Sequence, residues 1–209
     1  MSTEKIPAFG GKGYQSMRNN DFTPEAAIAE VIDNSIEAEA KNIKIKIFQS
    51  IPPGKRKERP HTIIFGDDGI GMDKKTIQYA LQVGWSSRFN SRKGIGRFGV
   101  GMTYGAIRVC EFVEIYSREK GGDWLYTNLD IEDRPDNQQP GIEPVIQKPP
   151  PKELLSLVGD FGTLIIWKNI DRIGSEFDIK ELRHWIGRTY RKFIGEKIVK
   201  NKKIQKNDN

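Results

Sequence analysis

The chain has 209 residues, of which 36% are hydrophobic and 10% aromatic. This size and composition allow a substantial core without disulfide or metal staples, and they predict one soluble globular domain with a short appendage. The sequence has no run of about 18 apolar residues and no apolar secretory signal at its start, so we expect no membrane partner and a cytoplasmic location. The single cysteine, Cys110, excludes an intramolecular disulfide and a cysteine metal cluster.

The formal net charge of +6 comes from the C-terminal end of the chain. Residues 187–209 contain eight Lys or Arg against two acids, so the rest of the chain sums to zero. A basic tail can make a weak, salt-dependent contact with nucleic acid. The simpler interpretation is a solvated helix end that leads into a linker, and we assign residues 196–209 to such a tail or linker.

The first expected helix and strand follow from capping and periodicity. Thr23, Pro24 and Glu25 form a helix start, with an N-cap oxygen, a proline in the first turn and an acid near the positive end of the dipole. We expect this helix to end at Ala38. Isoleucines alternate with lysines over 42–49, which predicts a strand with one buried face.

The remaining elements are predicted by their apolar periodicity and their turn residues. In chain order they are a basic loop 52–60, a strand 61–67, a helix 74–83, a polar segment 84–96, a helix 100–109, a hairpin of 110–118 and 124–131, a proline-rich connection 135–151, a strand 162–170 and an amphipathic helix 177–194.

The first functional motif is AEVIDNSIEA at 29–38. Glu30 and Asn34 are four residues apart, so their side chains share one face of the expected helix. An amide oxygen can ligate Mg²⁺ and a neighbouring carboxylate can take a proton from water, a combination that suits nucleotide hydrolysis. Asp33 and Glu37 flank the pair. The alternative is a polar helix surface, but apolar neighbours place the pair near a buried face.

The second motif, DDGIGMD at 67–73, follows an apolar run directly, so Asp67 lies where a strand ends. Gly69 and Gly71 allow a sharp turn and the close approach of a flat ligand. A buried Asp67 carboxylate could accept a hydrogen bond from the amino group of adenine, and Met72 could cover the ring. A plain Asp-Gly turn is the alternative.

The third motif is GIGRFGVGM at 94–102. A glycine-rich loop before a helix presents free N–H groups to phosphate, and the cationic segment before it could act as a flap. No P-loop motif occurs, and no strand directly precedes the glycines as in a Rossmann fold. The residues expected to contact phosphate or to line this loop are Lys93, Gly96, Arg97, Phe98, Gly99, Val100, Gly101 and Met102.

In this order the three motifs resemble the Bergerat-fold ATPase superfamily, which includes gyrase B subunits, ninety-kilodalton heat-shock chaperones, sensor histidine kinases and MutL proteins. The first box together with GWSSR at 84–88 is most similar to the Morc-type group. A fourth match is Thr163 in FGTLIIW, where the superfamily has a threonine that supports the adenine-binding aspartate.

The resemblance implies an α/β two-layer sandwich over residues 14–195, with a mixed sheet and helices on one face, preceded by an N-terminal arm at 1–13. It also implies ATP and Mg²⁺ as cofactors, with Glu30 as general base, Asn34 as metal ligand and Asp67 as adenine reader. Gly96, Gly99 and Gly101 would cradle the phosphates.

The implied activity is ATP hydrolysis that drives lid closure and homodimerisation. Relatives take a phosphate-sensing lysine from a second domain, so we expect slow turnover by these residues alone and a partner protein or C-terminal effector domain. The alternatives are a histidine-kinase-type phosphotransferase, a non-hydrolysing ATP-gated dimerisation module and a nucleic-acid binder that uses the basic tail. We interpret the two histidines, His61 and His184, as structural.

Overall fold

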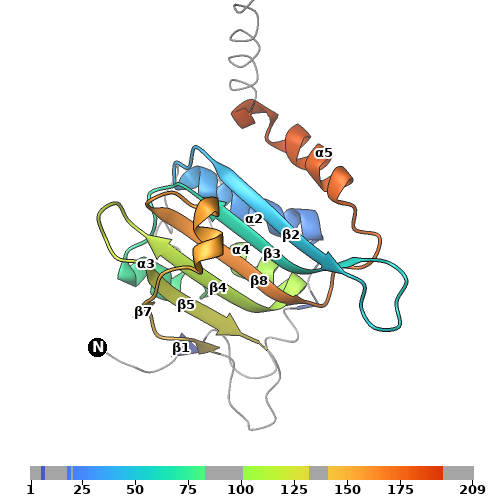
Figure 1. Cartoon of the computed structure of the whole chain (residues 1–209), viewed down its shortest axis with the longest axis horizontal. Coiled ribbons are helices and arrows are strands. Elements are labelled where there is room, and N and C mark those ends of the chain that lie inside the picture. Colours follow the sequence, from blue (N-terminus) through green and yellow to red (C-terminus); the bar gives the residue numbers. More distant parts are fainter. Residues whose placement is uncertain (1–5, 8–17, 20, 83–100, 132–140, 195–209) are drawn as a thin grey trace, which may run out of the picture. The chain divides into compact units, whose positions relative to one another are not determined.

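The structure is a computed structural model that describes residues 6–7, 18–19, 21–82, 101–131 and 141–194 (Figure 1). The chain divides into two compact units, Met1–Gly174 and Ser175–Asn209, and each is described by itself.

The first unit is built on one sheet (Figure 1). In order across the sheet its strands are β1 (Ile6–Pro7), β6 (Gly141–Ile142), β5 (Leu125–Asp130), β4 (Cys110–Arg118), β8 (Gly162–Ile170), β3 (Arg59–Asp67) and β2 (Ile43–Ser50), with β7 (Ile146–Gln147) paired to β5.

The expectation of a mixed sheet is wrong, because every strand pairing in the described residues is antiparallel. The reason lies in the connections. β2 with β3 and β4 with β5 form hairpins, and β8 enters between β3 and β4 running opposite to both. Parallel neighbours would need a long crossover between adjacent strands instead.

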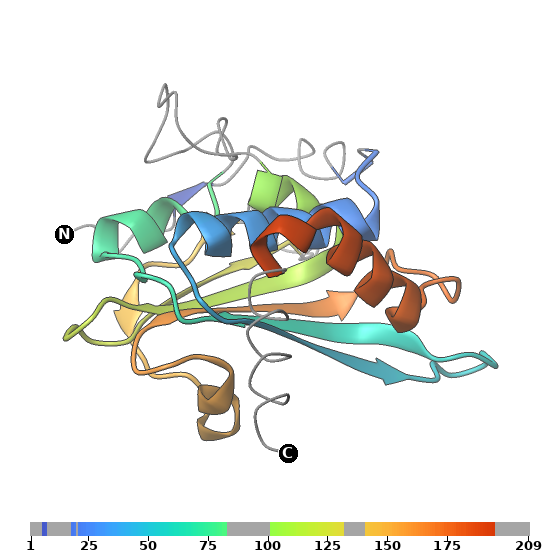
Figure 2. The same cartoon turned by 90° about the horizontal axis from the view of Figure 1, so that it is seen from above.

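The two-layer arrangement with helices on one face is confirmed (Figure 2). Among the described residues of the first unit, α2 (Pro24–Glu37), α3 (Lys74–Tyr79) and α4 (Gly101–Val109) lie on one side of the sheet. The short 3₁₀ helix η1 (Lys152–Leu157) lies on the other side.

Helix α2 begins where its capping residues predict. Thr23 has extended backbone angles, and its side chain accepts a hydrogen bond from the backbone N–H of Ala26 at 3.2 Å. The buried positions recur at helical spacing and face the core; they are Ala27, Ile28, Val31, Ile32 and Ser35.

Helices α2 and α4 approach closely at a glycine. A Cβ added to Gly105 would lie 2.9 Å from the Cα of Ala27 and 3.0 Å from its Cβ. Gly105 and Ala27 are both buried, so the two helices can approach this closely only because Gly105 has no side chain.

We therefore expect Gly105→Ala to destabilise the protein by about 1–3 kcal/mol, because the added methyl group must push the two helices apart. The urea midpoint of unfolding measures this. Gly187→Ala is the matched control, since a Cβ there meets nothing within 4 Å and alanine favours a helix over glycine by up to about 1 kcal/mol. A midpoint for Gly105→Ala at or above that of the wild type contradicts the close contact.

The sheet face opposite the three helices carries its own apolar cluster. Leu154 and Val158, from η1 and the residue after it, pack there on side chains of the central strands. The buried members of this cluster are Ile64, Tyr116, Tyr126, Leu154, Val158, Leu164 and Ile166. The proline-rich connection thus leads into a short segment that covers part of this face of the sheet, which its composition did not predict.

A buried carboxylate lies beside that cluster. Glu114 on β4 is 6% exposed, accepts a hydrogen bond from the Tyr126 hydroxyl at 2.9 Å and pairs with Lys168 at 2.5 Å. Burial raises the pKa of Tyr126 well above its ordinary value, and the Glu114 charge raises it further. Tyr126 is therefore a donor to Glu114 throughout the neutral range.

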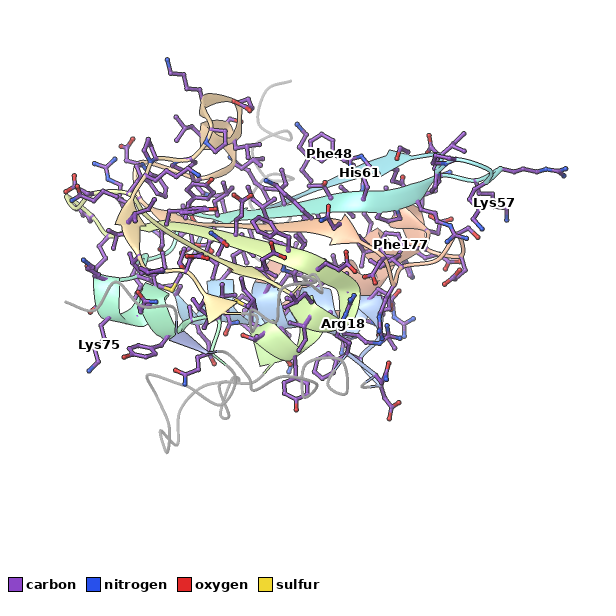
Figure 3. The ribbon with its side chains drawn as sticks, turned by 90° about the horizontal axis from the view of Figure 1, so that it is seen from below. Arg18, Phe48, Lys57, His61, Lys75 and Phe177 are labelled. Carbon is purple, nitrogen blue, oxygen red and sulfur yellow. The ribbon has the colours of Figure 1, made fainter. Side chains whose placement is uncertain are left out.

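Arg18, labelled in Figure 3, connects the segment before α2 to the end of α4. Its Nε donates to the carbonyl oxygen of Ile107 at 2.9 Å, and its guanidinium pairs with Glu111 at 3.4 Å and with Asp171. Arg172 in turn donates to the carbonyl oxygen of Arg18 at 2.6 Å. A cation at this position also complements the negative end of the helix dipole.

The second unit contains α5 (Ile179–Thr189), which confirms the central part of the amphipathic helix expected at 177–194. Its N-cap, Asp178, accepts a hydrogen bond from the backbone N–H of Lys180 at 2.6 Å. In the part of the chain that the structure describes, no helix combines the length and the apolar content needed to cross a bilayer.

Candidate functional site

The carboxylate and the amide of the first motif lie one turn apart on α2. The Asn34 side chain is exposed, whereas Glu30 is half-buried. Burial raises the pKa of Glu30 above its ordinary value of 4.5, and the carboxylates of Asp33 and Glu37 raise it further. A raised proton affinity makes Glu30 better suited to accept a proton from a bound water.

Asp67 ends β3 as a buried carboxylate, with 5% of its surface exposed. The Ser35 hydroxyl donates to its Oδ2 at 3.0 Å, and the Gly69 backbone N–H donates to its Oδ1 at 2.9 Å. Burial raises the pKa of Asp67 and outweighs the opposing hydrogen bonds from Gly69, Ser35 and Thr163. Because Ser35 directly follows Asn34 on α2, this contact brings the first and second motifs together in space.

Asp68 has a different and local role. Its Oδ1 accepts from the backbone N–H groups of Lys41 and Asn42, and its Oδ2 accepts from the Asn42 amide, each at 2.7 Å. Burial opposes ionisation, but these donors lower the pKa of Asp68 below its ordinary value. Asp68 therefore anchors the loop to the start of β2, and the structure separates it from the ligand role expected of Asp67.

The two glycines of the second motif are required by the protein's own backbone. A Cβ on Gly69 would lie 2.7 Å from the carbonyl oxygen of Ala38. Gly71 has a φ of +74°, and a Cβ there would lie 2.1 Å from the carbonyl oxygen of Arg118. The sequence suggested room for a ligand at these positions, but the space is filled by the end of α2 and the end of β4.

Thr163 and Met72 meet at a serine on β4. Thr163 pairs with Asp67 in the β3–β8 register, and its Oγ1 lies 2.9 Å from the Oγ of Ser117. The backbone N–H of Met72 donates to the same Ser117 oxygen at 2.9 Å. The strands β3, β4 and β8, together with the loop after β3, thus bring together three residues that the sequence had singled out: Asp67, Met72 and Thr163.

Sequence reasoning missed the two hydroxyls that make these connections, Ser35 and Ser117. Each interrupts a buried apolar pattern: Ser35 continues the buried face of α2 one turn after Val31, and Ser117 follows the inward-facing Val113 and Ile115 of β4. A small polar residue at a core position needs a partner, because an unpaired buried polar group is costly. That signal was present in the sequence.

Most of the third motif lies outside the described residues. Outside the described ranges lie the expected phosphate-site residues Lys93, Gly96, Arg97, Phe98, Gly99 and Val100, together with the GWSSR segment at 84–88. Gly101 is the first residue of α4, and Met102 is partly buried in its first turn. The phosphate contacts of this motif stay a prediction.

A buried acceptor at a strand end, a carboxylate and amide on the adjoining helix, and an antiparallel sheet covered on one face define a two-layer nucleotide-binding domain. Residues 22–156 match the family described as "Histidine kinase-, DNA gyrase B-, and HSP90-like ATPase". This match covers more than half of the chain, and the chain belongs to that family.

Curated relatives support the Morc-type resemblance. Protein MICRORCHIDIA 5 of Arabidopsis thaliana is 28% identical over 95 residues, which are 46% of this chain and 13% of that protein. ATPase morc-1 of Caenorhabditis elegans is 26% identical over 108 residues, 50% of this chain and 12% of that protein. Protein MICRORCHIDIA 2 of Arabidopsis thaliana is 30% identical over 100 residues, 46% of this chain and 15% of that protein. The chain therefore corresponds to a small part of each relative.

Proposed function

We propose that the first unit binds ATP between α2, the end of β3 and the start of β8, and that it hydrolyses the nucleotide. Asp67 accepts a hydrogen bond from adenine, Thr163 supports Asp67, and Glu30 is the general base. The observation that carries this proposal is the bond from Ser35 to Asp67 at 3.0 Å, which joins the adenine acceptor to the helix that bears the base.

Asp67 gives the site its preference for adenine. A carboxylate offers acceptors alone, and the exocyclic amino group of adenine is a donor. Guanine presents a carbonyl oxygen at the equivalent position, which would face the buried carboxylate acceptor to acceptor. Such an unpaired buried contact discriminates strongly between ligands.

Mg²⁺ would be held by Asn34 together with the phosphates of the nucleotide. The exposed Asn34 amide supplies an oxygen, and Glu30, Asp33 and Glu37 concentrate negative charge along the same helix. This donor set fits magnesium, which takes few protein ligands and keeps several waters. When bound, the metal neutralises charge on the phosphates.

We further propose that ATP closes the segment 84–96 over the phosphates and promotes homodimerisation through the arm at 1–13. Membership of the ATPase family and similarity to the Morc-type relatives support this. Residues 196–209 would lead toward an effector domain or partner protein, and their basic side chains would make weak contact with nucleic acid.

Three measurements on the whole chain test the proposal: calorimetric titration with ATP and Mg²⁺, phosphate release, and size-exclusion chromatography with a non-hydrolysable analogue. We expect saturable binding, free phosphate and an analogue-dependent dimer. Phosphate transferred to a protein would indicate a phosphotransferase, and dimerisation without phosphate release would indicate a non-hydrolysing gate. If deletion of 197–209 abolishes nucleic-acid binding at low salt, the tail carries that contact.

The rate of hydrolysis should fall on the acidic side at a pH above 4.5, because the pKa of Glu30 is raised and the base must be ionised to act. Glu37→Gln removes one of the charges that raise this pKa, so the acidic limb of the profile should move to lower pH. A pH–rate profile under saturating ATP measures both. A limb that does not respond to Glu37→Gln would contradict the assignment of Glu30 as the titrating group.

A further inference from the structure

Ser117 carries a buried hydroxyl that contacts both the loop after β3 and the start of β8, two segments of the candidate adenine site. It has no exposed surface. Its Oγ accepts from the Met72 backbone N–H at 2.9 Å, donates to the carbonyl oxygen of Gly162 at 3.2 Å and lies 2.9 Å from Thr163 Oγ1. We propose that Ser117 is a positioning residue that sets nucleotide selectivity, a proposal that rests on the ATP-binding function above and deepens it.

Ser117 lies between two closely packed junctions of the backbone. The loop that carries Met72 lies directly on the end of β4, because a Cβ on Gly71 would be 2.1 Å from the carbonyl oxygen of Arg118. The start of β8 lies equally close to the end of β3, since a Cβ on Gly162 would be 2.0 Å from the carbonyl oxygen of Asp67. Ser117 is the side chain that bonds both junctions to each other. Its hydroxyl therefore fixes the separation between Met72, which is expected to cover adenine, and β8, whose Thr163 is expected to support Asp67.

The hydrogen bonds of Ser117 also fix the direction in which the Thr163 hydroxyl points its hydrogen. A serine hydroxyl has one hydrogen and two acceptor positions, and the Met72 N–H takes one of those positions. Ser117 donates its hydrogen to the Gly162 carbonyl oxygen, so the Thr163 hydroxyl donates to Ser117 and offers a ligand acceptors alone. The exocyclic amino group of adenine is a donor and fits these acceptors, whereas the carbonyl of guanine at the same position is an acceptor and does not. Without Ser117 the Thr163 hydroxyl can turn its hydrogen toward that guanine carbonyl, so the preference for adenine falls.

The test is Ser117→Ala in the full chain, with dissociation constants for ATP, GTP and inorganic pyrophosphate measured by calorimetry. We expect the ratio of ATP affinity to GTP affinity to fall about tenfold, the effect of one misplaced hydrogen bond, while the affinity for pyrophosphate stays the same. Thr127→Val is the matched control. Thr127 is another fully buried hydroxyl, which donates to the carbonyl oxygen of Glu143 at 2.6 Å, and its loss should leave the ATP-to-GTP ratio unchanged.

Two further variants keep the proposal testable if Ser117→Ala does not fold. Ser117→Thr keeps the hydroxyl and should keep the selectivity of the wild type, whereas Thr163→Val should lose it. An unchanged ATP-to-GTP ratio in folded Ser117→Ala, or in Thr163→Val, would overturn the proposal. A wild-type chain that binds no ATP would overturn the proposed function instead.

Discussion

Asp67→Asn is expected to weaken ATP binding about 10- to 100-fold without destabilising the nucleotide-free protein. In the proposed function the carboxylate accepts a hydrogen bond from the adenine amino group, and an amide can turn its own donor toward that group. Calorimetric titration with ATP measures the loss. ATP affinity equal to that of the wild type would show that the adenine pocket is elsewhere.

The stability half of this prediction follows from the pKa of Asp67. Burial holds that pKa above its ordinary value, so the folded state binds the proton more tightly than the unfolded state does. The contribution of Asp67 to stability is therefore present at low pH and is lost as the pH rises through the raised pKa. At neutral pH the ionised Asp67 opposes folding, and removing its charge should leave the urea midpoint equal or higher. The difference in urea midpoint between Asp67→Asn and the wild type should become smaller as the pH is lowered.

The local hydrogen bonds allow the substitution. Ser35 Oγ lies 3.0 Å from Asp67 Oδ2 and also 3.1 Å from the carbonyl oxygen of Val31. Its hydrogen can turn toward Val31, so that Ser35 accepts a bond from the new amide. Asp68→Asn is the matched control next in sequence. Because its donors hold the pKa of Asp68 below the ordinary value, that variant should lose stability at neutral pH while keeping ATP affinity.

Glu30→Ala should abolish most hydrolysis and leave ATP affinity close to that of the wild type. A positioned general base contributes about 10²- to 10⁴-fold to a rate, and Glu30 lies one helical turn from the Asn34 amide rather than beside Asp67. Phosphate release under saturating ATP, together with a calorimetric titration, separates the two quantities.

Glu25→Ala is the control for this variant, since Glu25 is a carboxylate in the first turn of the same helix. It should keep the wild-type rate. Hydrolysis by Glu30→Ala at the wild-type rate would remove Glu30 from the mechanism, whereas a parallel loss of ATP affinity would assign it to binding.

The fold could be predicted from the sequence wherever one element buries one face. The helix at 24–38, the strand at 162–170 and the hairpin at 110–131 show clear periods, and the structure contains each within two residues at either end. The antiparallel order could not be predicted, because it depends on where β8 inserts. The two-residue strands β1, β6 and β7 are too short to carry any period.

The candidate site could be predicted in its motif residues and not in its connections. Asp67 and Thr163 followed from motif order and resemblance, and their juxtaposition in the β3–β8 register is confirmed. Ser35 and Ser117 could have been found only by asking what a hydroxyl does in an apolar stripe. Met72 is attached through its backbone N–H, a contact that no side-chain pattern reveals.

The position of β8 has a consequence for the order of folding. The β2–β3 and β4–β5 hairpins are local in sequence and can form early. Among the described strands, β8 alone joins them in the sheet, and it comes nearly last in the first unit. Such a distant pairing closes a long loop and forms slowly. Asp67, Ser117 and Thr163 lie on β3, β4 and β8, so the proposed adenine site is not assembled until β8 has inserted. During synthesis, the ability to hold ATP would thus appear only after residue 170 has left the ribosome, and bound nucleotide would mark a completed sheet.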